Sequence, residues 1–208
     1  KSLNDLKQFL NINLEIPKKN FFIVKSKEAE NRLDCYSLSY EYKKLLEGLK
    51  NISGDFNLIL GKDLNIIKTI SKEQFKKLAT NEFKYIEVKN ANIQPNLIDG
   101  YTEDVLMALP SRARQKVETN DVIIPRPIGS NKGIGIIPER HNNQLVSTGF
   151  IVIRPEDYDE AILLWSILRS EIIQKQFFYL QSGSLQPEIT PRDFKKVLIP
   201  IPKDPNTI

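Results

Sequence analysis

The residues of this sequence that are best suited to chemistry are the cations between Ser111 and Asn142. They are Arg112, Arg114, Lys116, Arg126, Lys132 and Arg140. Three acidic residues oppose these six, so the segment has a local charge of +3, and four of the six are arginines although lysine is commoner elsewhere. The planar guanidinium forms paired hydrogen bonds with guanine edges and phosphates, whereas lysine offers a point charge. The segment favours contact with a polyanion, and a solvated loop surface is the open alternative.

Amide and hydroxyl side chains that could read a base lie in two polar loops. Asn131 is in one loop, and Gln181, Ser184 and Gln186 are in the other. Asparagine and glutamine can pair with adenine in the major groove through two hydrogen bonds. These are also common loop residues, so base reading and an ordinary solvated loop both remain open.

The chain has one histidine, His141, and one cysteine, Cys35. Single copies exclude two-histidine metal centres, multi-cysteine zinc sites and an internal disulfide. His141 lies in a polar loop and the sequence has no Gly-x-Ser-x-Gly motif, so we predict an exposed nucleic-acid contact rather than a general base. For Cys35 we predict a small, half-buried hydrophobic side chain rather than a reactive thiol.

Glu87 and Lys89 form a Glu-x-Lys pattern, and Asp55 and Asp63 precede it. Such a set could hold a catalytic metal ion, as in restriction nucleases. Because Glu-x-Lys is frequent by chance, a metal-dependent nuclease is only a weaker alternative.

The composition is that of an ordinary globular protein. The chain has 208 residues and a mass of 24.0 kDa, is 40% hydrophobic and 27% charged, and has a net charge of +4 and a pI near 9.0. No run approaches the roughly 18 apolar residues of a membrane span, and the first residues lack a signal-peptide pattern. We therefore expect a cytoplasmic protein that does not enter a membrane. Residues 1–28 are predicted to be an N-terminal extension and residues 29–208 a single domain.

Hydrophobic periodicity and turn residues predict an α+β fold with long loops. Helices are predicted over residues 40–49, 72–78, 161–180 and 191–196, with an amphipathic stretch at 3–10. Strands are predicted over residues 21–24, 85–88, 122–125, 133–137, 150–153 and 197–202, with an extended piece at 108–110. The cation-rich segment therefore falls among strands, and the glutamine loop follows the longest helix.

Four segments occur in an order that is typical of one protein family. The first is Asn-Arg-Leu-Asp ahead of a leucine-rich helix (31–40), and the second is the strand region 85–93. The third is a turn from Val117 to Asp121 that leads into an apolar strand (117–124). The fourth is a closing loop and short helix (183–194), followed by the strand Ile-Pro-Ile-Pro (199–202). In the third segment Asn120 replaces the family's usual glycine. Spanning Asn31 to Pro202, these segments together resemble the target-recognition domain of type I restriction–modification specificity subunits.

The resemblance implies a twisted, mostly antiparallel sheet with helices packed on one side and long loops facing DNA. It implies non-catalytic recognition of double-stranded DNA for an adenine methyltransferase subunit or domain, with a restriction subunit as a further partner. The sequence has neither an Asn/Asp-Pro-Pro-aromatic loop nor a glycine-rich cofactor strand, so we expect no cofactor. We expect an isolated recognition domain, a half-subunit, or the recognition portion of a fused methyltransferase.

The charge cluster and the polar loops suggest a division of roles among the candidate residues. Phosphate contacts are expected from Lys116, Lys132 and Arg140. Base contacts are expected from Arg112, Arg114, Arg126, Gln181, Ser184 and Gln186, with Asn131 and His141 also at the DNA. The alternative from another class is a protein–protein scaffold that binds the methyltransferase without reading DNA. A shared basic face for residues 111–116, 126–132 and 181–186 would favour DNA reading.

Overall fold

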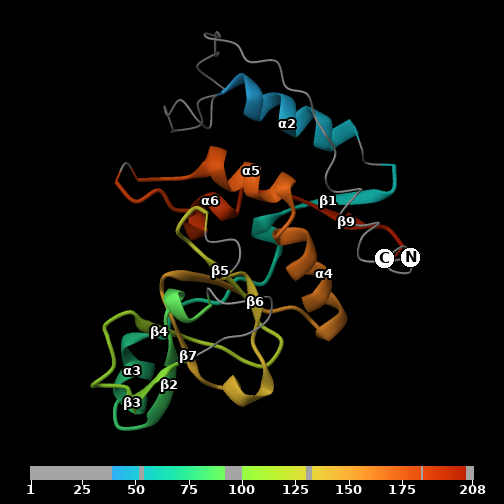
Figure 1. Ribbon diagram of the computed structural model, residues 1–208. Coiled ribbons are helices and arrows are strands. Elements are labelled where there is room, and N and C mark those ends of the chain that lie inside the picture. Colours follow the sequence, from blue (N-terminus) through green and yellow to red (C-terminus); the bar gives the residue numbers. More distant parts are fainter. Residues whose placement is uncertain (1–38, 52–53, 92–99, 130–132, 184, 205–208) are drawn as a thin grey trace. The chain divides into compact units, whose positions relative to one another are not determined.

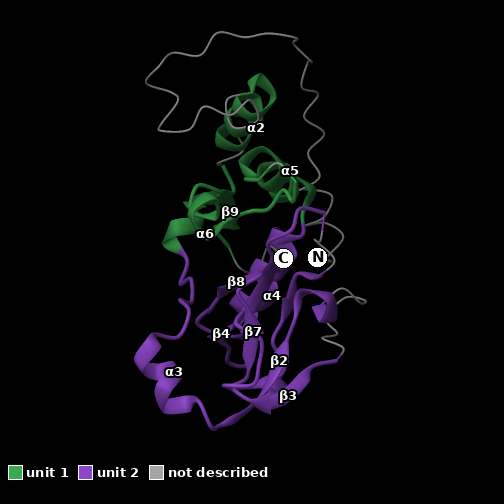
Figure 2. Ribbon diagram, turned by 90° about the vertical axis from the view of Figure 1, so that its left-hand side faces the viewer, with its two compact units in different colours: residues 1–63, 170–208 green, residues 64–169 purple. Residues whose placement is uncertain are grey.

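The computed structural model describes residues 39–51, 54–91, 100–129, 133–183 and 185–204, which divide between two compact units (Figures 1 and 2). The discontinuous unit combines residues 1–63 with residues 170–208, and the continuous unit comprises residues 64–169. The predicted extension over residues 1–28, the predicted strand at 21–24 and Cys35 lie outside the described residues.

The discontinuous unit pairs strands from distant parts of the sequence. Its elements are α2 (Tyr40–Asn51), β1 (Phe56–Leu60), a 3-10 turn (Gly61–Asp63), α5 (Glu171–Leu180), α6 (Pro191–Phe194) and β9 (Leu198–Pro202). β1 and β9 are antiparallel, with Phe56 opposite Pro202 and Leu60 opposite Leu198. The buried amide of Gln176 donates to the Leu198 carbonyl (2.7 Å) and accepts from the Leu198 N–H (2.8 Å). These bonds attach α5 to β9 and satisfy both backbone groups of one strand residue.

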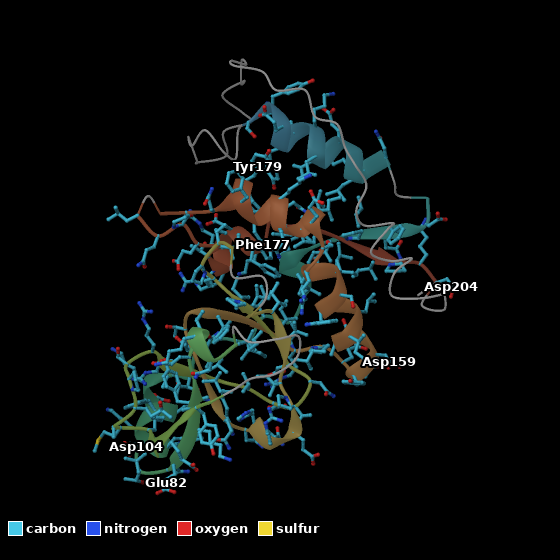
Figure 3. The ribbon with its side chains drawn as sticks, viewed as in Figure 1. Glu82, Asp104, Asp159, Phe177, Tyr179 and Asp204 are labelled. Atoms are coloured by element: carbon cyan, nitrogen blue, oxygen red, sulfur yellow. The ribbon has the colours of Figure 1, made fainter. Side chains whose placement is uncertain are left out.

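Aromatic stacking joins the two longer helices of the discontinuous unit. The rings of Tyr42 on α2 and Tyr179 on α5 are stacked with centroids 5.4 Å apart. Tyr179 is labelled in Figure 3. Phe177, on the other side of α5, is buried and lies against the ring of Phe194 on α6, with centroids 6.1 Å apart. α5 therefore packs between α2 and α6.

The continuous unit contains two sheets. The first has the strand order β3 (Thr102–Val105), β2 (Glu82–Ile86), β7 (Leu145–Ser147), β4 (Ala113–Lys116). Its β2–β7 pair is parallel and its other pairs are antiparallel. The second, fully antiparallel sheet has the order β6 (Gly135–Ile136), β5 (Val122–Pro125), β8 (Phe150–Ile153). The helical elements are α3 (Lys72–Leu78), α4 (Tyr158–Leu168) and 3-10 turns at Val88–Ala91 and Glu139–His141.

Both faces of the four-stranded sheet are buried. One hydrophobic cluster contains Phe83, Tyr85, Leu106, Leu109, Ala113 and Leu145, with Phe75 and Leu78 of α3 packed on it. The other contains Ile86, Ala91, Val117, Ile123, Ile137, Val146, Phe150 and Val152. Tyr85 and Ile86 are neighbours in β2 yet belong to different clusters, because successive strand side chains point to opposite faces. Ala113 of the edge strand β4, which carries candidate cations, belongs to the first cluster, and Val117, just after β4, belongs to the second.

The predicted α+β class and the mostly antiparallel pairing are confirmed. The strands are distributed over three sheets, and one pair, β2–β7, is parallel. Among the described residues, no helix is long and apolar enough to cross a membrane.

The single helix predicted over residues 161–180 is wrong. The segment forms two helices, α4 and α5, separated by Arg169 and Ser170. Ser170 has an extended backbone (ψ 150°) at the N-cap of α5, and an acidic residue, Glu171, follows in the first turn. Apolar side chains continue on both sides of this break, so periodicity alone concealed a local helix start.

Three strand predictions also need correction. The extended piece predicted at 108–110 is a turn, because the N–H groups of Ala108 and Leu109 both donate to the Val105 carbonyl. The strand predicted over 85–88 instead runs from Glu82 to Ile86 and is followed by a 3-10 turn. The strand predicted over 133–137 is reduced to Gly135–Ile136.

Candidate nucleic-acid interface

The cation-rich segment is organised by the turn that leads into β5. Asn120 has a φ of 72°, in the left-handed region where glycine and asparagine are the favoured residues. This is the position at which the motif usually has glycine, so the substitution keeps the required conformation. The side chain of the next residue, Asp121, is fully buried, and it accepts a hydrogen bond from the Glu118 N–H (2.8 Å). The turn is thus closed by its own carboxylate.

Arg154 neutralises both acidic residues of this turn. Its Nε and Nη2 atoms each lie 2.9 Å from a carboxylate oxygen of Asp121, and its Nη1 lies 2.8 Å from Oε1 of Glu118. Hydrogen bonding to Asp121 is the main cause that raises the pKa of Arg154, which therefore stays charged. Arg154, which lies outside the cation-rich segment, is therefore the arginine that pairs with both of these carboxylates.

The turn between β7 and β8 brings two of the predicted arginines together. The Thr148 N–H donates to the carbonyl of Arg112 (2.9 Å), and the Thr148 carbonyl accepts from Nη1 of Arg126 (3.0 Å). The N–H of Arg126 also donates to the Gly149 carbonyl (2.9 Å). Arg112 itself is exposed, and no described carboxylate forms an ion pair with it. We call Arg112, Arg126 and Thr148 the arginine corner.

Arg114 has a different environment from Arg112. The β4–β7 register shifts between Ala113 and Gln115, which is a β-bulge at Arg114. The guanidinium carbon of Arg114 lies 4.0 Å from the centroid of the Phe75 ring, and its Nη1 donates to the Ala113 carbonyl (2.9 Å). Arg112 precedes β4, and the bulge at Arg114 interrupts the alternation of side chains along the strand, so the two arginines do not occupy equivalent strand positions.

His141 is buried, not exposed as predicted. Only 2% of its surface is accessible, and its ring contacts Tyr101 edge-on with centroids 5.8 Å apart. Its Nδ1 has no hydrogen-bond partner among the described residues. Burial lowers the pKa of His141, and the positive charges of Arg140 and Lys84 lower it further. His141 is therefore a neutral packing residue in this conformation, whereas its neighbour Arg140 is exposed.

A second group of predicted residues lies in the closing loop of the discontinuous unit. Ser182 and Glu188 exchange two backbone hydrogen bonds (2.8 and 2.9 Å), which close the loop between them. The Ser182 hydroxyl also donates to Oδ2 of the buried Asp193 (2.8 Å), and the Thr190 hydroxyl donates to the same oxygen (2.7 Å). The loop therefore projects from a base that is fixed to the N-terminus of α6.

The tip of this loop is exposed. Leu185 is 95% exposed, and Gln186 and Pro187 are exposed beside it. Gly183 has a φ of 93°, and a Cβ there would lie 2.8 Å from the Gln186 carbonyl oxygen. Gln181, predicted to be reachable from solvent, is instead buried with 8% of its surface accessible. Gln186 thus remains the reachable glutamine of this loop.

The remaining predicted residues divide into two groups. Lys116 is half-buried on β4. Asn131, Lys132 and Ser184 lie outside the described residues. The arginine corner belongs to the continuous unit and the Gln186 loop to the discontinuous unit.

The Glu-x-Lys pattern has an ordinary structural role. Lys89 forms an ion pair with Glu87, and the Glu87 N–H donates to Oδ1 of Asn90 (2.9 Å). Asp63, in the other unit, accepts from the Leu60 N–H (2.9 Å). In the described part of the chain, no group of three or more His, Cys, Asp or Glu residues is placed to hold a metal ion.

Two residues important for this arrangement were not found from the sequence. Thr148 acts through its backbone, which leaves no side-chain signal. Arg154 lies 33 residues after Asp121, outside the cation-rich segment. Arg154 directly follows an apolar strand, and this position could have indicated a structural ion pair, because a charge at the end of a buried strand needs a partner.

The sequence matches no family model and no curated protein. Two solved structures show what the chain is similar to. One, from work on complex assembly and conformational transition of the type I restriction–modification system, has a TM-score of 0.60 and 25% identity and covers 72% of this chain and 38% of that chain. The other, the HsdS subunit from Thermoanaerobacter tengcongensis, has a TM-score of 0.56, 25% identity and the same coverage, 72% and 38%. This chain thus spans less than half the length of either structure, and we identify its fold as that of a target-recognition domain of type I restriction–modification specificity subunits.

Proposed function

We propose that this chain recognises a specific double-stranded DNA sequence on behalf of an adenine methyltransferase and performs no catalysis itself. The structural likeness to type I specificity subunits carries the proposal. The charge arrangement supports it, because Arg154 pairs with Glu118 and Asp121, whereas the exposed Arg112 forms no ion pair with any described carboxylate. The scaffold alternative gives no reason for an exposed arginine without a carboxylate partner.

The arginine corner is proposed to read a guanine. Arg112 is exposed, and its backbone is fixed by the hydrogen bond from Thr148. Arg126 is fixed both through its backbone and through Nη1, with the rigid Pro125 and Pro127 on either side. A positioned guanidinium loses little side-chain entropy on binding, and each good bidentate contact discriminates between bases by about 1–3 kcal/mol. Lys116, Lys132 and Arg140 are proposed to hold phosphates, which fix register without reading sequence.

The loop between Ser182 and Glu188 is proposed to read a second part of the site. Gln186 can form two hydrogen bonds with adenine, and the exposed Leu185 offers an apolar contact for a thymine methyl group. The fixed loop base keeps the entropy cost of placing these side chains low. Ser184 and Asn131 are proposed as further polar contacts. Gln181 and His141 are not proposed as DNA contacts, because both are buried.

The proposed partners are DNA, an adenine methyltransferase subunit or domain, and a restriction subunit. The methyltransferase would supply the S-adenosylmethionine site, so no cofactor is proposed for this chain. We propose that it acts in the cytoplasm, where such a complex meets cellular DNA.

The function is tested by selection from a randomised duplex library, using the chain assembled with its methyltransferase partner. We expect one DNA sequence to be enriched, and Arg112→Ala to relax the choice at one base pair of it. Enrichment of no sequence, or identical enrichment by the methyltransferase without this chain, would refute the proposal. Metal-dependent cleavage that is lost in Glu87→Gln would favour the nuclease alternative instead.

A further inference from the structure

Helix α3 and the residues just before it carry lysines that have no role in the interface described so far. Lys68, Lys72, Lys76 and Lys77 are all exposed, and Glu73 is the acidic residue among residues 68–77. No described carboxylate lies within 4.0 Å of any of these four lysine nitrogens, in contrast with Lys44 and Lys175, which pair with glutamates. The segment therefore carries a charge of +3, and in the described part of the chain none of these lysines forms an ion pair.

The helix that carries these lysines is firmly held. Ser71 and Gln74 form a capping box: the Ser71 Oγ accepts from the Gln74 N–H (3.1 Å), and Oε1 of Gln74 accepts from the Ser71 N–H (2.8 Å). Phe75 and Leu78 pack on the buried cluster that includes Tyr85 and Leu145. The lysines are thus presented by a fixed element.

Lys72 is at a position that folding does not favour. It is the first residue of α3, where the partial positive charge of the helix N-terminus opposes a cation. Lys76 and Lys77, in the last turn, have the opposite and favourable relation to the helix dipole. Lys72 and Lys76 are one turn apart and so share a face of the helix. The charge of Lys72 therefore needs an explanation other than stability.

The N-terminal end of α3 adjoins the cationic edge of the four-stranded sheet. The Ile70 N–H donates to the Arg114 carbonyl (2.7 Å), and the guanidinium of Arg114 stacks on Phe75. Strand β4, which carries Arg114 and Lys116, is one edge of this sheet. The acidic residues Glu103 and Asp104 lie on β3, the opposite edge of the sheet. Figure 3 labels Asp104, and also Glu82 on the neighbouring strand β2. The two edge strands of the four-stranded sheet therefore carry opposite charges, with cationic side chains on β4 and acidic side chains on β3.

We infer that α3 is a phosphate-binding element, with Lys72 and Lys76 contacting the DNA backbone beside the bases that the arginine corner reads. This inference rests on the proposed function and adds a surface that the cation count over residues 111–142 did not include. Two lysines on a fixed helix bind the backbone as point charges and do not discriminate between bases. The stacked Arg114 joins this surface to β4.

The test compares Lys72→Gln/Lys76→Gln with the unaltered chain, each assembled with the methyltransferase. It measures Kd for cognate and scrambled duplexes while the salt concentration is varied between about 50 and 200 mM, a range over which phosphate contacts weaken. Each lost phosphate contact lowers the slope of log K against log salt by about 0.9, so we expect a loss of about 2. Affinity should fall by the same factor for both duplexes. Lys72→Arg/Lys76→Arg should retain the original slope.

The matched control is Lys44→Gln/Lys175→Gln, which removes two lysines that are already paired with glutamates on helices of the other unit. We expect this control to leave the slope unchanged. An unchanged slope for the α3 variant, an equal change in the control, or a change in the preferred sequence would overturn the α3 inference while leaving the proposed function intact. Failure of the unaltered complex to prefer any sequence would instead refute the proposed function.

Discussion

Arg154 and Asp121 form a bidentate ion pair, in which Nε and Nη2 of the arginine each lie 2.9 Å from a different carboxylate oxygen. The carboxylate is fully buried, and it also accepts the Glu118 N–H, so it closes the turn into β5 and fixes the end of β8 at the same time. The pair thereby distinguishes Arg154, whose role is structural, from Arg112, which forms no ion pair with a described carboxylate.

We predict that Asp121→Ala lowers the free energy of unfolding by about 2–4 kcal/mol, because it removes a buried, paired carboxylate. Glu118→Gln should cost less than about 1 kcal/mol, because Glu118 is half exposed and its ion pair is screened by water. Urea denaturation of both variants measures the difference. Equal losses of unfolding free energy in the two variants would mean that the buried Asp121 ion pair stabilises the fold no more than the exposed Glu118 ion pair does.

The left-handed conformation of Asn120 makes a second prediction. Asn120→Gly should be neutral or slightly stabilising, whereas Asn120→Val should cost about 1–2 kcal/mol, because a branched side chain is strained at a φ of 72°. Thermal unfolding of the two variants checks this order. A similar loss in both would point to a role for the Asn120 side chain rather than its backbone.

The burial of His141 predicts a dependence of stability on pH. Because burial lowers its pKa in the folded chain, the unfolded chain takes up a proton first as the pH falls through about 6.5. The contribution of neutral His141 is therefore fully present above that pH and is lost below it. His141→Phe should reduce the slope of unfolding free energy against pH, in the range below about pH 6.5, by up to one proton. Arg140→Gln, next to it, should keep most of the slope, and an unaltered slope in His141→Phe would contradict the account.

The Gln186 loop gives a fourth prediction. Gln186→Ala, in the assembled enzyme, should cost about 1–3 kcal/mol of DNA-binding free energy for the cognate duplex and relax the choice at one base pair. Pro187→Ala, at the neighbouring exposed position, serves as the control and should keep the preferred sequence. Competition binding with single-base variants of the duplex measures both. Equal weakening for cognate and scrambled duplexes would reassign Gln186 as a backbone contact.

Local signals in the sequence were sufficient for several elements. The helices predicted over residues 72–78 and 191–196 correspond to α3 and α6, and in the structure Ser71 caps the first and Thr190 caps the second. The apolar strand before Pro125 was also predicted correctly. These features depend on residues within one turn of each other, which is the range over which capping and periodicity act.

Features that depend on distant contacts could not be predicted. His141 has polar neighbours in the sequence, yet Tyr101, forty residues earlier, contacts its ring. Arg112 and Arg126 are brought together by the backbone of Thr148, and Asp121 finds its partner 33 residues later. Tertiary contacts therefore decide which side chains pair within the fold, and position in the sequence does not show this.

The most direct test of sequence reading by this chain is the pattern of adenine methylation in cells. Long-read sequencing would compare genomes from cells with the intact gene, with the gene deleted, and with Arg112→Ala. We predict that methylation of one DNA motif disappears on deletion and extends to sequences differing at one position in Arg112→Ala. The same methylated motif in all three strains would contradict the assignment of DNA recognition to this chain.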